Sequence, residues 1–102
     1  MLETRFPRVL GDAGNPETWP FEVDLEIVRG IGVDAAVRGA KIPGRDDLFI
    51  DAARRLEQRG ASLITTSCGF LILFQAALQA AIRVPVVTSS LLAVPLLASV
   101  LD

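Results

Sequence analysis

The residue best suited to chemistry in this chain is Cys68, its only cysteine. It lies in a short polar turn, Thr66-Ser67-Cys68-Gly69, between a run that predicts a strand and a pattern that predicts a helix. The N-terminus of a helix lowers the pKa of a thiol and also binds anions, because its backbone N–H groups are unpaired. A thiolate there would act as a proton-abstracting base or as a nucleophile. The alternative interpretation is a buried structural thiol, because free cysteines are among the most buried residues.

Hydroxyl residues near the cysteine are candidates for binding a small carboxylate. Thr65, Thr66 and Ser67 lead into the turn. Successive residues of a strand point to opposite faces, so at most one of the two threonines faces a ligand. A second polar turn, Thr88-Ser89-Ser90, either caps the segment that follows it or helps to bind the same carboxylate.

The elements that would position these two turns form a βαβ unit. Residues 62–66 and 84–87 are apolar and β-branched, which is typical of short buried strands, and residues 70–82 carry apolar side chains at helical spacing. Strands joined by a crossover helix run parallel with a right-handed connection. Ligands gather at the carboxyl ends of such strands. Because each polar turn follows a strand, we expect both at the same edge of the sheet.

The first twenty residues form a segment without periodicity that is rich in Gly and Pro. Loops of this length are unusual in a compact domain unless they are functional or disordered. One interpretation is an ordered surface loop. The other is an active-site flap in which Arg5, Arg8 or Asn15 faces an anionic ligand.

The other segments complete an alternating order of strands and helices. Residues 23–27 alternate between apolar and charged, which predicts a half-exposed edge strand, and residues 32–44 predict a connection. A helix is expected over residues 46–59, and another over residues 91–101. We therefore predict an α/β fold, a parallel sheet flanked by helices in a Rossmann-like arrangement, as a single domain over residues 1–102.

Composition excludes several classes of function. The 102 residues have a net charge of −2 with scattered charges, which does not favour nucleic-acid binding. The absence of histidine removes Cys-His and Ser-His catalysis and histidine metal sites. One cysteine allows no internal disulfide and suits a reducing cytoplasm, where we place the protein. No signal peptide is visible, and prolines and hydroxyl residues interrupt the apolar run 84–101, which disfavours a membrane helix.

The segment ITTSCGF (residues 64–70), followed by a helical pattern and then VPVVTSS (residues 84–90), resembles the aspartate/glutamate/hydantoin racemase superfamily. The opening TRFPRVLGDAGNPETWPFEV (residues 4–23) is similar to poorly characterised members of that group. The resemblance implies two α/β domains that face each other, each with one cysteine, and no pyridoxal phosphate or metal. One thiolate removes the α-proton and the other thiol reprotonates the opposite face.

The resemblance also implies roles for individual residues. Cys68 matches the first of the two cysteines. Ser67, Gly69 and Phe70 match the turn around it, whose backbone N–H groups would hold the substrate carboxylate. Asn15 is carried over as a further substrate-binding residue. Thr66, Ser89 and Ser90 complete the predicted binding site.

Two features depart from the family pattern. Characterised racemases have Asn-Thr after this cysteine, whereas this chain has Gly69-Phe70, so the amide and hydroxyl that would grip the substrate are missing. The chain also has no second cysteine, and it ends where the first domain of the family would cross into the second. A carbanion that is protonated on either face needs a proton donor on each side. We therefore expect that the chain alone does not racemise efficiently.

These observations predict a cofactor-independent racemase-like or isomerase-like domain that acts on a small amino acid or carboxylic acid through Cys68. Single-cysteine relatives with decarboxylase or isomerase activity leave the reaction type open. We expect a homo-oligomer or a missing second domain, and neither nucleic acid nor membrane as a partner. The alternative is a non-catalytic module of the same fold that binds a small acid or serves assembly, with residues 91–101 buried against another subunit. A membrane-associated chain using that segment is a third hypothesis.

Overall fold

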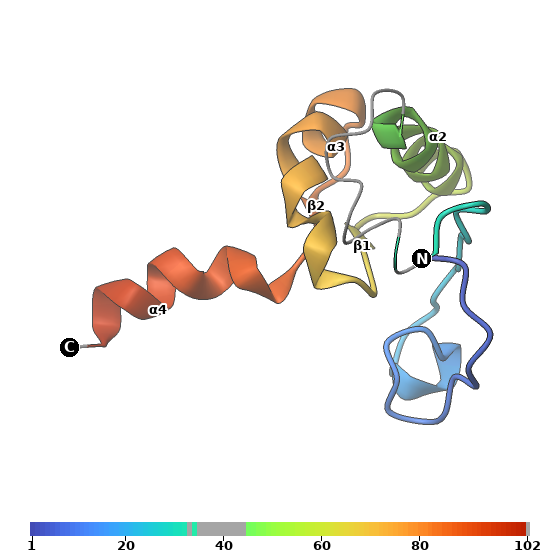
Figure 1. Ribbon diagram of the computed structural model, residues 1–102, viewed down its shortest axis with the longest axis horizontal. Coiled ribbons are helices and arrows are strands. Elements are labelled where there is room, and N and C mark those ends of the chain that lie inside the picture. Colours follow the sequence, from blue (N-terminus) through green and yellow to red (C-terminus); the bar gives the residue numbers. More distant parts are fainter. Residues whose placement is uncertain (33, 35–44, 102) are drawn as a thin grey trace.

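The computed structural model describes residues 1–32, 34 and 45–101, and Figure 1 shows how their elements are arranged. Most of the connection predicted over residues 32–44 lies outside the described residues. The elements, in which η denotes a 3₁₀ helix, follow one another as η1 (Pro16–Thr18), α2 (Arg45–Gln58), β1 (Ile64–Thr65), η2 (Gly69–Phe74), α3 (Gln75–Ala81), β2 (Val86–Val87), η3 (Ser90–Ala93) and α4 (Val94–Val100).

The strands β1 and β2 form a two-stranded parallel sheet in which Ile64 pairs with Val86 and Thr65 with Val87. The segment between them contains η2 and α3, so the predicted parallel βαβ unit is confirmed. Both strands are shorter than the sequence indicates. The described residues thus form a small α/β fold with three α-helices, and the wider Rossmann-like arrangement stays a prediction.

The strand predicted over residues 23–27 is wrong. These residues adopt no strand, and the segment makes only an isolated parallel bridge between Leu2 and Val28. Val28 N donates to Met1 O at 2.8 Å, and Glu3 N donates to Ile31 O at 3.2 Å. The charges in this segment instead bind α2 and the residue after it, because Glu26 pairs with Arg55 of the helix and with Arg59 just beyond its end.

The helix α2 agrees in position with the predicted helix over residues 46–59. Phe49, Ala52 and Ala53 are buried, whereas Leu48 is 44% exposed. The helix is followed by Gly60, which has a φ of +98°, the left-handed conformation that ends many helices and that glycine adopts without strain. Ala61 N donates to Leu56 O at 3.1 Å and so closes the last turn.

The single helix predicted over residues 70–82 is divided into two elements. Residues 69–74 form the 3₁₀ helix η2, and the α-helical bonds begin only at Gln75. The predicted apolar face is nevertheless correct in its centre, because Leu71 and Leu78 are buried and Phe74 packs against the Phe49 ring at a centroid distance of 5.1 Å. These contacts join η2 and α3 to the core that also contains Ile64 and Val86, and the Cys68 turn connects the end of β1 to η2.

The C-terminal segment extends away from the rest of the molecule. In Figure 1, α4 points outward from the end of η3, and every residue from 90 to 101 is exposed. Ser89 Oγ accepts a hydrogen bond from Leu91 N at 3.1 Å, which confirms the predicted cap of this segment. Among the described residues, the structure has no helix whose length and apolar character would suffice to traverse a bilayer.

Candidate functional site

The two predicted polar turns lie next to each other at the carboxyl ends of β1 and β2. The Thr66 hydroxyl donates to the carbonyl oxygens of Thr88 at 2.6 Å and of Cys68 at 3.0 Å, and so shares its one hydrogen between the two turns. Cys68 N lies 3.4 Å from the same hydroxyl oxygen. The expectation that both turns share one sheet edge is therefore confirmed.

Cys68 occupies the junction between β1 and η2, as predicted. It is the residue that precedes η2, and its backbone is extended, with a φ of −131°. Its side chain is partly buried and packs against the apolar core. The sulfur is therefore neither fully exposed nor sealed in the interior.

The second turn lies within van der Waals reach of the glycine that follows the cysteine. A side-chain carbon at Gly69 would lie 3.4 Å from Ser89 Oγ, the nearest atom outside its own chain neighbours. Ser89 is 6% exposed, and its oxygen accepts from Leu91 N. Ser89 is thus a helix cap whose hydroxyl hydrogen remains available at the boundary between the two turns.

The other predicted binding residues around the cysteine differ in accessibility. Ser67, Phe70 and Ser90 are exposed, and Phe70 retains 53% of its accessible surface. Thr65 is exposed, and its hydroxyl donates to Val87 O at 2.8 Å, within the sheet. The structure thus groups Thr66, Ser67, Gly69, Phe70, Ser89 and Ser90 in the two adjacent turns beside Cys68.

Asn15 has a structural role in the N-terminal loop. Its Oδ1 accepts from Glu17 N at 2.9 Å and caps η1, and its Nδ2 donates to Arg8 O at 3.0 Å. Both ends of the amide are therefore bonded within the loop. In Figure 1 the loop that contains η1 projects from the body at a distance from β1 and β2. The structure does not bring Asn15 into the group of residues around Cys68.

Arg8 is likewise engaged within the loop. Its guanidinium pairs with Asp12 at 3.1 Å, donates to Thr4 Oγ1 at 2.9 Å and lies over the Phe6 ring at 4.5 Å from the centroid. The pKa of Asp12 is lowered, because the hydrogen bond from Gly14 N, together with the hydrogen bond and charge of this arginine, outweighs the opposing effect of burial. The loop is thus an ordered structure with its own hydrogen bonds, and its role as a flap stays a prediction.

Two glutamines that the sequence interpretation passed over hold the outer edge of β2. Gln79 Nε2 donates to Val84 O at 3.1 Å, and its Oε1 accepts from Val86 N at 2.9 Å. Gln75 Nε2 donates to Val86 O at 2.8 Å, and its Oε1 accepts from Thr88 N at 3.0 Å. The signal in the sequence is a pair of amides four residues apart on a helix between two strands, because residues at i and i+4 share one face.

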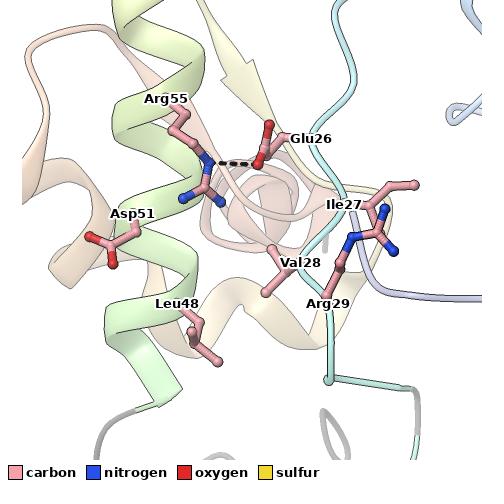
Figure 2. A pocket seen from close by; sticks show the side chains of 7 residues that line it. All are labelled: Glu26, Ile27, Val28, Arg29, Leu48, Asp51 and Arg55. Carbon is pink, nitrogen blue, oxygen red and sulfur yellow. Dashed lines mark hydrogen bonds and ion pairs between the residues drawn. The ribbon is translucent and has the colours of Figure 1, made fainter.

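A pocket of about 300 Å³ lies elsewhere, between α2 and the segment that carries Val28. Figure 2 shows that Arg55 points toward Glu26, at 2.7 Å, whereas Asp51 lies apart on α2. None of its lining residues belongs to the predicted site, as the complete set is Glu26, Ile27, Val28, Arg29, Leu48, Asp51 and Arg55. The pocket therefore lies where α2 packs against this segment. The thiol and the hydroxyl groups of the predicted site lie in the two turns around Cys68 instead.

The part of the chain that the structure describes has no group of three or more acidic or cysteine side chains that could hold a metal ion. The chemistry available at the two turns is that of one thiol, several hydroxyls and the backbone N–H groups around residue 69. These groups suit a small carboxylate and a proton transfer at the carbon next to it.

Comparison with known proteins identifies one group of similar sequences. The chain is 32% identical over 94 residues to dimethylsulfoniopropionate lyase 6 of Emiliania huxleyi, a match that covers 92% of this chain and 24% of that protein. It is 33% identical over 95 residues to the dimethylsulfoniopropionate lyase of Durusdinium sp. clade D, covering 92% of this chain and 32% of that protein. The chain thus spans about a quarter to a third of the length of these relatives. No protein-family model and no solved structure matches the chain.

These relatives overturn the family predicted from the sequence. The motifs around Cys68 and residues 4–23 suggest the aspartate/glutamate/hydantoin racemase superfamily, but the curated relatives over 92% of the chain are named dimethylsulfoniopropionate lyases. The predicted racemase or isomerase activity is therefore wrong, and the relatives are lyases. The similarity of short motifs was misleading here because a cysteine turn between a strand and a helix does not by itself identify a reaction.

Proposed function

We propose that this chain contributes the Cys68 site of a lyase that acts on dimethylsulfoniopropionate. The observation that carries the proposal is the identity of about one third, over 92% of the chain, to proteins named for that activity. The position of Cys68 in one of two adjacent polar turns supports it, because the site combines one thiol with donors for a carboxylate.

The substrate has two features that the site would have to recognise. One end is a carboxylate, which the exposed Ser67 and Ser90 and the backbone N–H groups after Cys68 would bind. The other end is a dimethylsulfonium cation. Phe70, more than half exposed and two residues from the thiol, offers an aromatic face, and such faces attract cations.

The reaction requires only one base. The Cys68 thiolate takes a proton from the carbon next to the carboxylate, and the electrons of that C–H bond form a carbon–carbon double bond. The bond between the neighbouring carbon and the sulfonium breaks, and its electron pair leaves with dimethyl sulfide. Acrylate remains, and the Cys68 thiol returns its proton to water.

A reaction that needs only one base suits the single cysteine of the chain better than racemisation does. Racemisation needs a proton donor on the face opposite to the base, and the chain has no second thiol. Elimination discharges the carbanion by expelling the leaving group, so no second donor is needed. The proposal therefore uses the same residue as the sequence interpretation but assigns it a different overall reaction.

The test is to incubate the full 102-residue chain with dimethylsulfoniopropionate and to measure dimethyl sulfide by headspace gas chromatography and acrylate by NMR. Loss of a general base costs about 10²–10⁴-fold in rate, so Cys68→Ala should reduce release by that factor. Ser99→Ala, at an exposed site on α4, is the matched control and should leave the rate unchanged. Equal rates for the Cys68→Ala variant and the unaltered chain would refute the role of the thiol.

Binding is tested separately from turnover. Dimethylsulfoniopropionate should slow the alkylation of Cys68 by iodoacetamide, because a bound carboxylate at the turn shields the sulfur. Choline, which carries a similar cation but no carboxylate, is the matched control ligand and should protect less. Equal labelling rates with and without substrate, together with no release of dimethyl sulfide, would contradict the proposed function of this chain.

A further inference from the structure

We propose that Gln75 is a positioning residue for the cysteine turn, and that it acts through Thr88 and Thr66. Its role in a reaction rests on the function proposed above. The chain of hydrogen bonds itself does not, because it is a property of the folded protein that can be tested without any substrate.

The chain of hydrogen bonds begins on α3 and ends at the turn. Gln75 Oε1 accepts from Thr88 N at 3.0 Å and from Thr88 Oγ1 at 2.8 Å. Thr88 O accepts from the Thr66 hydroxyl at 2.6 Å. The Thr66 hydroxyl in turn contacts both backbone polar atoms of Cys68, its carbonyl oxygen at 3.0 Å and its nitrogen at 3.4 Å. One amide side chain is thus connected to the cysteine backbone through two threonines.

The centre of this network is closed to water. Thr88 is 0% exposed, so its hydroxyl and N–H have no alternative partner if Gln75 is removed. A buried polar group that loses its partner costs more than the bond was worth, since it keeps its desolvation penalty. The least costly response is for the Thr88 turn to move, and such a movement carries Thr66 with it.

The same helix contains a matched control. Gln79 lies one turn after Gln75 and also hydrogen-bonds the backbone of the second strand, at Val84 and Val86. It makes no bond to Thr88 or Thr66 in the part of the chain that the structure describes. Replacing Gln79 therefore removes the same kind of interaction with β2 but leaves the connection to Cys68 intact.

The experiment compares Gln75→Leu with Gln79→Leu by the rate at which iodoacetamide alkylates Cys68 in the folded full chain. Cys68 is partly buried, so loosening of its turn should raise the rate. We expect an increase of about fivefold for Gln75→Leu, the equivalent of one hydrogen bond, and little change for Gln79→Leu.

Dependence on denaturant separates a local effect from a general loss of stability. Labelling through local opening is nearly insensitive to low urea, whereas labelling through global unfolding rises with the surface exposed on unfolding. The added labelling in Gln75→Leu should be insensitive to urea. Equal rates in the two glutamine variants, or an increase that follows global unfolding, would overturn the proposal.

A second pair of variants tests the same connection from its other end. Thr66→Val keeps the shape of the side chain but removes the hydroxyl, whereas Thr66→Ser retains it. Thr66→Val should raise the labelling rate as Gln75→Leu does, and Thr66→Ser should restore the rate of the unaltered chain. If the residues act as one unit, the double variant Gln75→Leu/Thr66→Val should label no faster than the faster single variant. Full additivity would contradict the connection.

The lyase assay distinguishes failure of this inference from failure of the proposed function. If both hold, Gln75→Leu lowers kcat/KM and Gln79→Leu does not, because the turns that move contain both the base and the carboxylate donors. If Gln75→Leu alters labelling but the unaltered chain releases no dimethyl sulfide, the hydrogen-bond connection is supported and the proposed lyase activity is refuted. If the chain is active and Gln75→Leu matches Gln79→Leu in labelling and kcat/KM, the proposed lyase activity is supported and the positioning role of Gln75 is refuted.

Discussion

Cys68 illustrates what a single residue reveals about function and what it does not. Its position at the end of a buried run, followed by glycine, correctly predicted the junction between β1 and η2. The adjacency of the two hydroxyl turns was predictable as well, because parallel strands end at the same edge. The reaction was not predictable from these residues, since a thiol beside a helix N-terminus is compatible with more than one class of reaction.

The glutamines show why part of the site escapes a residue-by-residue interpretation. Gln75 and Gln79 read as the polar positions of an amphipathic helix, which usually face water. In the structure they face the edge of β2, because that strand leaves backbone groups that need partners. Their role depends on the distance between a helix and a strand, which local sequence does not specify.

Gly60 provides a prediction at the scale of one residue. Its φ of +98° is in the left-handed region, and an added side chain would meet nothing within 4 Å. Gly60→Ala should therefore lower the free energy of unfolding by about 1 kcal/mol through the backbone alone, as measured in urea. Gly32→Ala, also without a steric neighbour but with an ordinary φ, is the control and should cost much less. Equal losses in the two variants would contradict this account.

At the scale of elements, the pattern of apolar residues predicted the helices better than the strands. The helix α2 was predicted almost to its ends because its periodicity and Gly60 agree. The strand predicted over residues 23–27 is wrong because alternating apolar and charged residues do not require a strand. Here the charged residues form ion pairs with arginines in and just after α2. The division between η2 and α3 was not predictable, since a 3₁₀ turn and an α-helix share nearly the same apolar spacing.

Leu78 provides a prediction at the scale of elements, because it ties α3 to the rest of the core. It is 4% exposed, whereas Leu73 on η2 is 64% exposed. Leu78→Ala should lower the free energy of unfolding by about 2–5 kcal/mol through lost burial and the cavity that remains. Leu73→Ala removes the same atoms from the surface and should cost less than about 0.5 kcal/mol. Urea unfolding followed by circular dichroism measures both, and similar losses would show that the buried face of this region is misassigned.

At the scale of the whole molecule, the N-terminal part is tied to α2 by charge. Glu26 pairs with Arg55 at 2.7 Å and with Arg59 at 3.0 Å, and Arg59 also contacts Asp24. Burial raises the pKa of Glu26, but the hydrogen bonds and charges of the two arginines outweigh it, so the net pKa is lowered. Because the arginines are about half exposed, the interaction is worth less than a fully buried pair.

The Glu26 pairs predict a dependence of stability on pH. A carboxyl whose pKa is lowered by folding stabilises the protein fully above its unfolded pKa of about 4.3, and this contribution is lost as the pH falls through the folded value. Glu26→Gln should cost about 0.5–1 kcal/mol at neutral pH. The difference from the unaltered chain should shrink as the pH falls through the lowered pKa of Glu26 in the folded protein, because the carboxyl then becomes protonated.

Urea unfolding at neutral and acid pH measures that difference, and Glu22→Gln, at an exposed carboxylate of the same segment, should show almost none. A cost of Glu26→Gln that persists unchanged in acid would mean that side-chain packing, and not charge, links the two parts.

The amides that line the second strand also restrict how the sheet can grow. Pro85 O accepts from Ile64 N on the side of β1, so the backbone groups of Val84 and Val86 and the N–H of Thr88 face the opposite side. Glutamine side chains already satisfy the carbonyls of Val84 and Val86 and the N–H groups of Val86 and Thr88. A further strand from another polypeptide therefore has no free backbone groups to pair with on the outer side of β2. Any additional strand must pair with β1 instead.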